Sequence, residues 1–270
     1  MVTLKPKFVS KYPIEGRNIT PDIFAGKTIK EISKLEAWEG NRKLTLGDLF
    51  EITDDADSKD MIKIVGDASK VRNVGLKMTS GKIVVEGDIG WHLGEMMRGG
   101  SILVTGNSGS WAGSQMIDGT IEIKGNTGDY IGSAYRGSDK GMKGGTVIVH
   151  GNAGNEIGNN MRGGLIKIMG TVGIFAGVHM HGGTILIQGE SARRAGGHMT
   201  KGKIILAGKT EDVLPSFSIE QIKKSVKVAG EKIVGPFYVF AGDMAADGSG
   251  KLFVSQPNNP KLSSYEKYLD

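Results

Sequence analysis

Residues 81–99 read GKIVVEGDIGWHLGEMMRG, and the next two stretches, 100–118 and 119–137, repeat the pattern as GSILVTGNSGSWAGSQMID and GTIEIKGNTGDYIGSAYRG. Three further copies start at residues 145, 164 and 183. The units are 19 residues long, except that the third spans 26, which we attribute to an insert at 138–144 (SDKGMKG). A repeat of this length indicates units that fold alike and stack on one another.

Each unit carries a short β-strand followed by further apolar positions. The third and fifth residues of a unit, such as Ile83 and Val85, are apolar and mostly β-branched, which is typical of a strand with one buried face. Two more inward rows are expected at Leu93, Ala112, Ile131, Ile157, Ala176 and Ala195, and at Met97, Met116, Tyr135, Met161, Met180 and Met199. Because such short strands bury their apolar face only by stacking, the pattern predicts an all-β parallel β-helix, or β-solenoid, of about seven 19-residue coils with small terminal extensions.

Glycine is abundant and cysteine is absent. The chain has 43 glycines but 7 prolines and no cysteine. We expect the recurrent glycines to form turns that need a positive φ or a close approach of neighbouring coils. These structural turns are Gly87, Gly94, Gly106, Gly113, Gly125, Gly132, Gly151, Gly158, Gly170 and Gly177. Without cysteine, the chain cannot form disulfides or ligate an iron–sulfur cluster.

The repeats divide the chain into four parts. We expect an N-terminal lead or cap at 1–59, the repeats at 60–208, a C-terminal cap of helix and hairpin at 209–255 and an extended tail at 256–270.

Three local signals refine these boundaries. Residues 54–60 are polar and read as a linker. The sequence Ser-Ile-Glu-Gln at 218–221 is a capping box that predicts a helix to about Ala229. Residues 236–255 predict a β-hairpin with Asp247 and Gly248 in its turn.

Charge and hydropathy patterning exclude several classes of partner. The net charge of +5 comes from 34 basic and 29 acidic side chains that are spread along the chain, which favours a generally basic soluble surface over a nucleic-acid-binding site, so we expect no nucleic-acid partner. There is no uninterrupted apolar stretch long enough for a membrane span, and residues 1–10 lack the apolar core of a signal peptide. We therefore expect a cytoplasmic protein without a membrane partner.

The polar residues form no recognisable catalytic, cofactor-binding or metal-binding motif. His179 and His198 are equivalent residues of successive units and should stack near the interstrand spacing of about 4.8 Å, with His181 close by. Because Asn160 occupies the preceding place in that row, a structural or interface role is favoured over a metal site. We therefore expect no catalytic, cofactor-binding or metal-binding residue on this chain.

One row of residues is a candidate interaction surface. It contains His92, Trp111, Tyr130, Glu156, Phe175 and Arg194, which should point outward because their neighbours point inward. The row is either a ladder that stabilises the coils or a docking surface for a partner. Together with the insert and the tail, it places the expected partner contacts at Trp111, Tyr130, Phe175, Asp139, Lys140, Tyr265 and Tyr268.

The segments GDIGWHLGEMMRGG at 87–100 and GNAGNEIGNNMRGG at 151–164 carry a family resemblance. They resemble the GXGXG right-handed β-helix that is shared by the C-terminal domain of the large glutamate synthase polypeptide and by the C subunit of formylmethanofuran dehydrogenase. The chain is most similar to the latter in its length, its ends and the phrase FYVFAGDMAADGSGKLFVSQ. The C subunit of a formyltransferase/hydrolase complex and a glutamate-synthase-like module remain alternatives.

The resemblance implies a noncatalytic scaffold subunit in a complex of methanogenic archaea that reduces CO2 and forms N-formylmethanofuran. The complex is expected to carry a tungsten or molybdenum pterin, iron–sulfur clusters and a dinuclear metal site, all on other subunits. The implied partners are a molybdopterin catalytic subunit, an amidohydrolase subunit, a small pterin-binding subunit and ferredoxin-like subunits. No catalytic residue of the family maps onto this chain.

Overall fold

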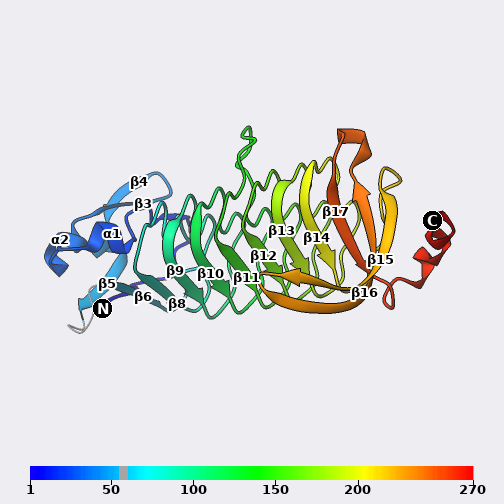
Figure 1. Ribbon diagram of the computed structural model, residues 1–270. Helices are drawn as coiled ribbons and strands as arrows, with labels where there is room; N and C mark the ends of the chain where they lie inside the picture. The colour runs from blue at the N-terminus through cyan, green and yellow to red at the C-terminus, as the bar shows by residue number, and fades with distance from the viewer. Residues whose placement is uncertain (55–59, 270) are drawn as a thin grey trace.

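The computed structural model of the protein describes residues 1–54 and 60–269. Figure 1 shows many strands side by side along one elongated sheet, with short helices at the N-terminal end and long strands crossing the C-terminal end. The predicted linker at 54–60 falls mainly on residues 55–59, which lie outside the described residues.

The repeat units supply the parallel middle of the long sheet. Its strands are β6 (Met61–Val65), β8 (Lys82–Glu86), β9 (Arg98–Val104), β10 (Asp118–Ile123), β11 (Thr146–Val149), β12 (Leu165–Ile168), β13 (His181–Ile187) and β14 (Lys201–Leu206). Equivalent residues lie opposite one another, as Ile102 does between Ile83 and Ile121. Single parallel bridges such as that between Ile89 and Ser108 also join the turns of successive units. Each unit therefore adds one strand in the register that the spacing predicts.

The N-terminal segment adds strands of both directions and a small second sheet. Strand β1 (Val2–Pro6) pairs in parallel with β6 and antiparallel with β5 (Phe50–Asp54). The second sheet contains β2 (Ile14–Glu15), β3 (Glu36–Glu39), β4 (Arg42–Thr45) and β7 (Val71–Arg72). Three short helices, α1 (Pro21–Phe24), α2 (Ile29–Ser33) and α3 (Leu46–Leu49), are each capped by a threonine side chain, which satisfies a free N–H of the first turn.

The C-terminal segment extends the long sheet with antiparallel strands. These are β15 (Ser218–Val228), β16 (Glu231–Gly242) and β17 (Gly250–Ser255), of which β17 also pairs in parallel with β14. The hairpin predicted at 236–255 is confirmed by the pairing of β16 with β17, and a short 3-10 helix, η1 (Met244–Ala246), lies in its turn.

The helix predicted from residue 218 is wrong, because this segment forms β15. Val226 and Val228 alternate toward a second apolar cluster that contains Phe237 and Phe253. Burial of that alternating face outweighs the local capping signal, since tertiary packing overrides weak helix propensity.

The fold class expected for the chain is also wrong. Instead of an all-β right-handed parallel β-helix of about seven coils, the described residues form a mixed sheet of 13 strands, a separate sheet of 4 strands and three short α-helices. The long sheet has the order β15-β16-β17-β14-β13-β12-β11-β10-β9-β8-β6-β1-β5. The repeat pattern covers only its parallel middle. The non-repeating ends add antiparallel strands that no sequence repeat predicts.

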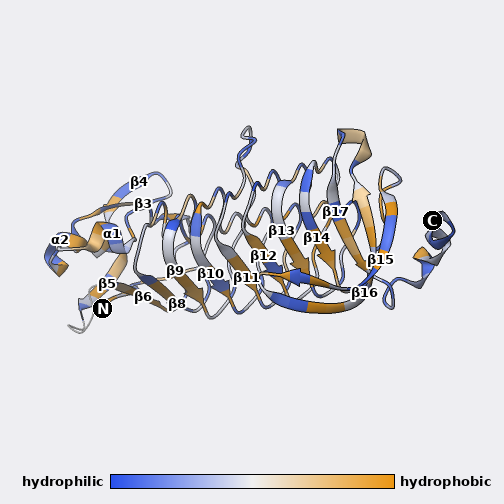
Figure 2. Ribbon diagram, viewed as in Figure 1, coloured by the Kyte–Doolittle hydropathy of each residue, from blue (hydrophilic) through white to orange (hydrophobic). Residues whose placement is uncertain are grey.

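A row of buried methionines runs through the core beneath the repeat strands. Met97, Met116, Met161, Met180 and Met199 are buried as predicted, whereas Tyr135 is 49% exposed. Met142 takes the place expected for Tyr135 and is fully buried. Figure 2 shows the apolar residues concentrated along the strands of the long sheet.

The exchange of Tyr135 for Met142 corrects the position of the insert. The Met142 N–H donates to the Gly132 carbonyl at 2.9 Å, as the Met116 N–H does to Gly113 at 3.1 Å in the preceding unit. The inserted residues are therefore 135–141 rather than 138–144. In Figure 1 they form the green loop that projects from the middle of the molecule.

The turn glycines have two different physical roles. A positive φ occurs at Gly87, Gly94, Gly113, Gly132, Gly158 and Gly177, whereas Gly106, Gly125, Gly151 and Gly170 lack it. At Gly170 a Cβ would lie 2.6 Å from the Gly151 carbonyl oxygen of the preceding unit. At these four positions glycine is therefore required because the backbone of the neighbouring unit is close, and not because φ is positive.

None of the helices in the described part of the chain has the length and apolar character that a membrane crossing requires.

Candidate partner-binding surface

Two rows of residues in the repeat units have a left-handed backbone although they are not glycine. One row contains Met96, Gln115, Asn160, His179 and His198, and the other lies four residues earlier in each unit. We call this row the aromatic column; its members are His92, Trp111, Tyr130, Glu156, Phe175 and Arg194, with φ between 54° and 65°. This conformation costs a residue with a Cβ about 1–2 kcal/mol, and glycine or asparagine adopts it more readily. The large side chains therefore serve a purpose that the turn itself does not require.

Stacked rings occupy the N-terminal half of the aromatic column. The rings of His92 and Trp111 are 5.2 Å apart with 5° between their planes, and those of Trp111 and Tyr130 are 4.6 Å apart with 12°. Farther along, the Arg194 guanidinium lies 5.4 Å from the centre of the Phe175 ring. Such contacts stabilise neighbouring units, so the ladder interpretation holds for these residues.

Two aromatic residues that were not predicted as contacts extend this surface. Tyr135, from the insert, lies 5.7 Å from the His92 ring and 6.2 Å from the Trp111 ring. Trp91 lies 5.7 Å from Trp111 and is 51% exposed. With these neighbours Trp111 is only 8% exposed, although it was expected to point into solvent. The exposed part of the surface is therefore formed largely by Tyr135 and Trp91.

The insert and the aromatic column line an open cavity of about 200 Å³. Its walls include Trp111, Tyr130 and Tyr135, together with the polar residues Glu156 and Asn159. The Asn159 amide donates to Glu156 Oε2 at 2.7 Å, and the Trp111 indole N–H is buried without a hydrogen-bond partner among the described residues. The cavity thus offers aromatic faces and polar groups to one side chain of a partner.

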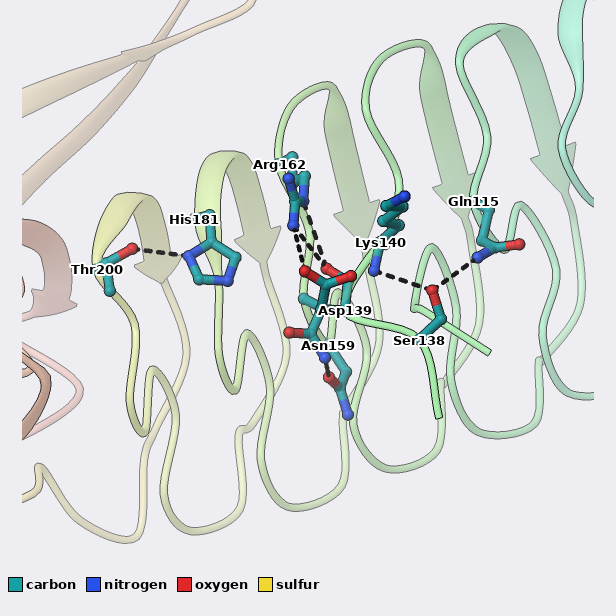
Figure 3. A network of polar contacts seen from close by, with 9 residues as sticks. Gln115, Ser138, Asp139, Lys140, Asn159, Arg162, His181 and Thr200 are labelled. Atoms are coloured by element: carbon teal, nitrogen blue, oxygen red, sulfur yellow. Dashed lines mark hydrogen bonds and ion pairs between the residues drawn. The ribbon is translucent and has the colours of Figure 1, made fainter. Parts of the chain in front are cut away.

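Polar contacts hold the base of the insert against the repeats (Figure 3). The Arg162 guanidinium forms a 2.9 Å ion pair with Asp139 and also donates to the Asp139 carbonyl oxygen at 3.1 Å. The Ser138 hydroxyl accepts from the Gln115 amide at 3.2 Å and from the Lys140 backbone N–H at 3.1 Å. Asp139 therefore anchors the insert, while the exposed Lys140 stays available to a partner.

The two predicted histidines stack, as their spacing indicates. The rings of His179 and His198 are 5.1 Å apart, and the His198 backbone N–H donates to Asp243 at 2.8 Å. Partial burial, followed by charge on His198 and on His181, lowers the pKa of His179, against a smaller opposing effect of Glu156. Charging both stacked rings is therefore unfavourable.

The tail differs from its prediction, because it is not extended. Residues Pro260–Tyr268 form a 3-10 helix, η2, with Leu262 buried, while Asp270 lies outside the described residues. The Tyr265 ring packs edge-on against Phe240 at 5.3 Å, so Tyr265 contacts its own chain. Tyr268, in contrast, is 65% exposed and keeps its predicted availability.

Chemistry-bearing residues do not converge elsewhere in the described ranges. Within residues 1–54 and 60–269, no three His, Cys, Asp or Glu side chains lie close enough together to hold a metal ion. One polar cluster contains Glu122, whose pKa is lowered by hydrogen bonds from Lys124 and then from His150. These three partly exposed residues form an ion-pair group at the ends of the neighbouring strands β10 and β11.

Comparison with known proteins gave partial and full-length matches. No protein-family model matches the chain. The C subunit of molybdenum-containing formylmethanofuran dehydrogenase 1 of Methanothermobacter marburgensis is 43% identical over 91 residues, which are 34% of this chain and 23% of that protein. The C subunit of tungsten-containing formylmethanofuran dehydrogenase 2 of Methanothermobacter wolfeii is 44% identical over 96 residues, which are 34% of this chain and 36% of that protein. These matches therefore span only 23% to 36% of the relatives' own lengths.

A structural match extends over nearly the whole chain. It is a chain in the crystal structure of the formyltransferase/hydrolase complex from Methylorubrum extorquens in complex with methylofuran. The TM-score is 0.83 at 33% sequence identity, and the match covers 94% of this chain and 99% of the other. The likeness therefore includes both non-repeating ends as well as the repeats.

Proposed function

Because this chain belongs to the family of the C subunits of formylmethanofuran dehydrogenases and formyltransferase/hydrolase complexes, we propose that it is a noncatalytic scaffold within such a complex. The observation that carries the proposal is the 33% identical chain that matches it over 94% of its length. The surface formed by the aromatic column and the insert supports a binding role, because aromatic and arginine side chains are enriched at protein interfaces.

We assign the complex to the formylmethanofuran dehydrogenase type, an oxidoreductase that reduces CO2 and forms N-formylmethanofuran. The local identity to dehydrogenase subunits, 43% over 91 residues and 44% over 96, supports this choice, since the formyltransferase/hydrolase C subunit is 41% identical over 76 residues. A formyltransferase/hydrolase complex is the second candidate, and the full-length structural match favours it. Partners would be the catalytic, amidohydrolase and small subunits of either assembly. The cytoplasmic location stays a prediction.

The cofactors of such a complex do not suit the residues of this chain. The sequence has no cysteine for an iron–sulfur cluster, and the described residues contain no cluster of three metal-ligating side chains. We therefore place the tungsten or molybdenum pterin, the iron–sulfur clusters and the dinuclear metal site on partner subunits. This chain would hold those subunits in place through the surface formed by the aromatic column and the insert.

Affinity purification of the tagged chain from its native host tests the proposal. We expect several other subunits to co-purify, together with tungsten or molybdenum and iron. A complex with subunits but without these metals would assign the chain to the formyltransferase/hydrolase type. Recovery of the chain without any other subunit would contradict the scaffold role.

A further inference from the structure

A groove at the N-terminal end of the molecule is separate from the insert cavity. Two cavities, of about 180 and 410 Å³, share Pro13 and Arg72 as lining residues. The first is also lined by Lys70 and Trp91, and the second by Glu15 and Trp38. We call these six residues the Arg72 groove. It places two tryptophans and a guanidinium along one concave surface.

Strand pairing fixes the charged residues of the groove. Glu15 on β2 and Arg72 on β7 are direct partners in parallel register. The two tryptophans are accessible, with 37% of Trp38 and 51% of Trp91 exposed. Because the Trp91 ring lies 5.7 Å from the Trp111 ring, the groove lies next to the aromatic column. A partner bound to one surface can therefore reach the other.

Two buried polar atoms of the groove lack partners. Arg72 Nε and Glu15 Oε1 have no hydrogen bond within the described residues, although their backbones are neighbours. The other Glu15 oxygen lies 3.4 Å from Arg17 and so is committed to an ion pair. Unpaired buried groups are costly, and most proteins satisfy them. The groove therefore favours a partner that offers an acceptor to the Arg72 guanidinium and a donor to the Glu15 carboxylate.

We propose that the Arg72 groove binds an extended segment of another subunit and that an Asp or Glu side chain of this segment pairs with the Arg72 guanidinium. A carboxylate matches the fork of N–H donors on arginine. The peptide backbone of the same segment supplies the N–H donor that Glu15 lacks, which an inorganic anion would not. Trp38 and Trp91 flank the charge pair and exclude water from it, as at the centre of other interfaces.

The charges around the groove favour a protein segment over nucleic acid. Glu15 and Glu36 line the larger cavity together with Arg17 and Arg72, so the groove has mixed charge and lacks the continuous positive surface that a phosphate backbone requires. A protein segment can place one carboxylate at Arg72 and neutral groups elsewhere. The site therefore suits a single acidic side chain within an extended, otherwise uncharged segment.

The inference rests on the proposed function, since it requires a complex. Arg72→Met tests it in the co-expressed complex, with Arg72→Lys as the charge-conserving control. We expect Arg72→Met to weaken the affinity for the other subunits at least about tenfold, and Arg72→Lys to weaken it less. The melting temperature of the isolated full-length variant should equal or exceed that of the parent, because an unpaired buried charge has been removed.

A photocrosslinker identifies the bound segment. With p-benzoylphenylalanine in place of Trp91, irradiation of the complex should join this chain to a peptide of another subunit that contains Asp or Glu. The same probe at Val234, which is 75% exposed on β16, serves as the control position. Crosslinks only to a second copy of this chain, to a peptide without an acidic residue, or no crosslink beyond that of the Val234 control would overturn the inference.

The two proposals fail in different ways. If the scaffold function is wrong, even the parent chain recovers no other subunit. If only the groove assignment is wrong, Arg72→Met recovers the other subunits as well as the parent does, or it melts at a lower temperature because Arg72 stabilises the isolated fold.

Discussion

The indole ring of Trp111 lies on the phenol ring of Tyr130 with 4.6 Å between centroids, although both residues have left-handed backbones with φ of 62° and 65°. Two strained residues in adjacent units therefore join in one stack. The ladder and docking interpretations of the aromatic column are compatible, because the stack stabilises the units while Tyr135 and Trp91 present the exposed surface.

Tyr135→Ala should separate docking from stability. The ring is 49% exposed and lies in the insert, so we expect the melting temperature of the isolated chain to stay close to that of the parent. Affinity for the other subunits should fall by about tenfold, as for an aromatic residue at an interface centre. Val234→Ala, on exposed β16, is the control and should change neither quantity. Equal partner affinity for Tyr135→Ala and the parent would remove the insert cavity from the interface.

Gly158→Val should destabilise the fold by more than about 2 kcal/mol. Its φ is 67°, and an added Cβ would lie 2.5 Å from Ile185 Cδ1 in the core. Gly230→Val is the matched control, because Gly230 also has a positive φ of 87° but no atom within 4 Å of the added Cβ. Chemical denaturation of both variants separates backbone strain from steric clash. If the two variants lose equal stability, crowding at Gly158 contributes nothing.

Asn259→Ala should unfold the C-terminal end more readily. Asn259 Oδ1 accepts from the Thr210 N–H at 2.8 Å, and its amide donates to the carbonyl oxygens of Gly208 at 3.1 Å and Ser255 at 2.8 Å. Loss of these buried partners should lower the free energy of unfolding by about 2 kcal/mol or more. Asn258→Ala is the control, because exposed Asn258 makes one such bond, to Ala207. Similar losses in both variants would argue against an intramolecular role of the tail.

The stacked rings of His179 and His198 predict that the stability of the fold depends on pH. In the folded protein the pKa of His179 is lowered from its ordinary value of 6.5. Below pH 6.5 the unfolded chain therefore binds more protons than the folded chain does. Stability from this site is thus present above that pH and is lost below it. His179→Asn should reduce the fall in melting temperature between about pH 7 and pH 5. Asn160→His, which adds a third ring to the row, should enlarge it, whereas unchanged curves for both variants would exclude repulsion between the rings.

Periodic packing explains what could be predicted from the sequence. Equivalent residues such as Ile102 and Ile121 had to lie opposite one another, because each unit buries the same face. The insert was misplaced because an inserted segment fits on either side of a core residue. Met142 could have resolved this choice, since methionine fills the same position in the neighbouring units.

The ends of the chain could not be derived in this way. Strand β15 forms because Val226 and Val228 cover an outer apolar cluster, a contact between residues distant in sequence. The ring contact between Tyr265 and Phe240 likewise depends on the tertiary fold and not on a local sequence pattern. In the candidate surface, the aromatic column could be predicted from the repeats. The contact of Tyr135 with the column could not, because it depends on the conformation of the insert. The backbone pairing of Glu15 in β2 with Arg72 in β7 also depends on a short parallel contact between distant segments.

The distribution of metal among separated subunits tests the central claim most directly. The tagged complex would be purified from the native host, its subunits separated under mild conditions, and tungsten, molybdenum and iron measured in each fraction. A noncatalytic scaffold predicts these metals in the partner fractions and none above background in the fraction of this chain. Stoichiometric metal that stays with this chain after separation would contradict the scaffold account.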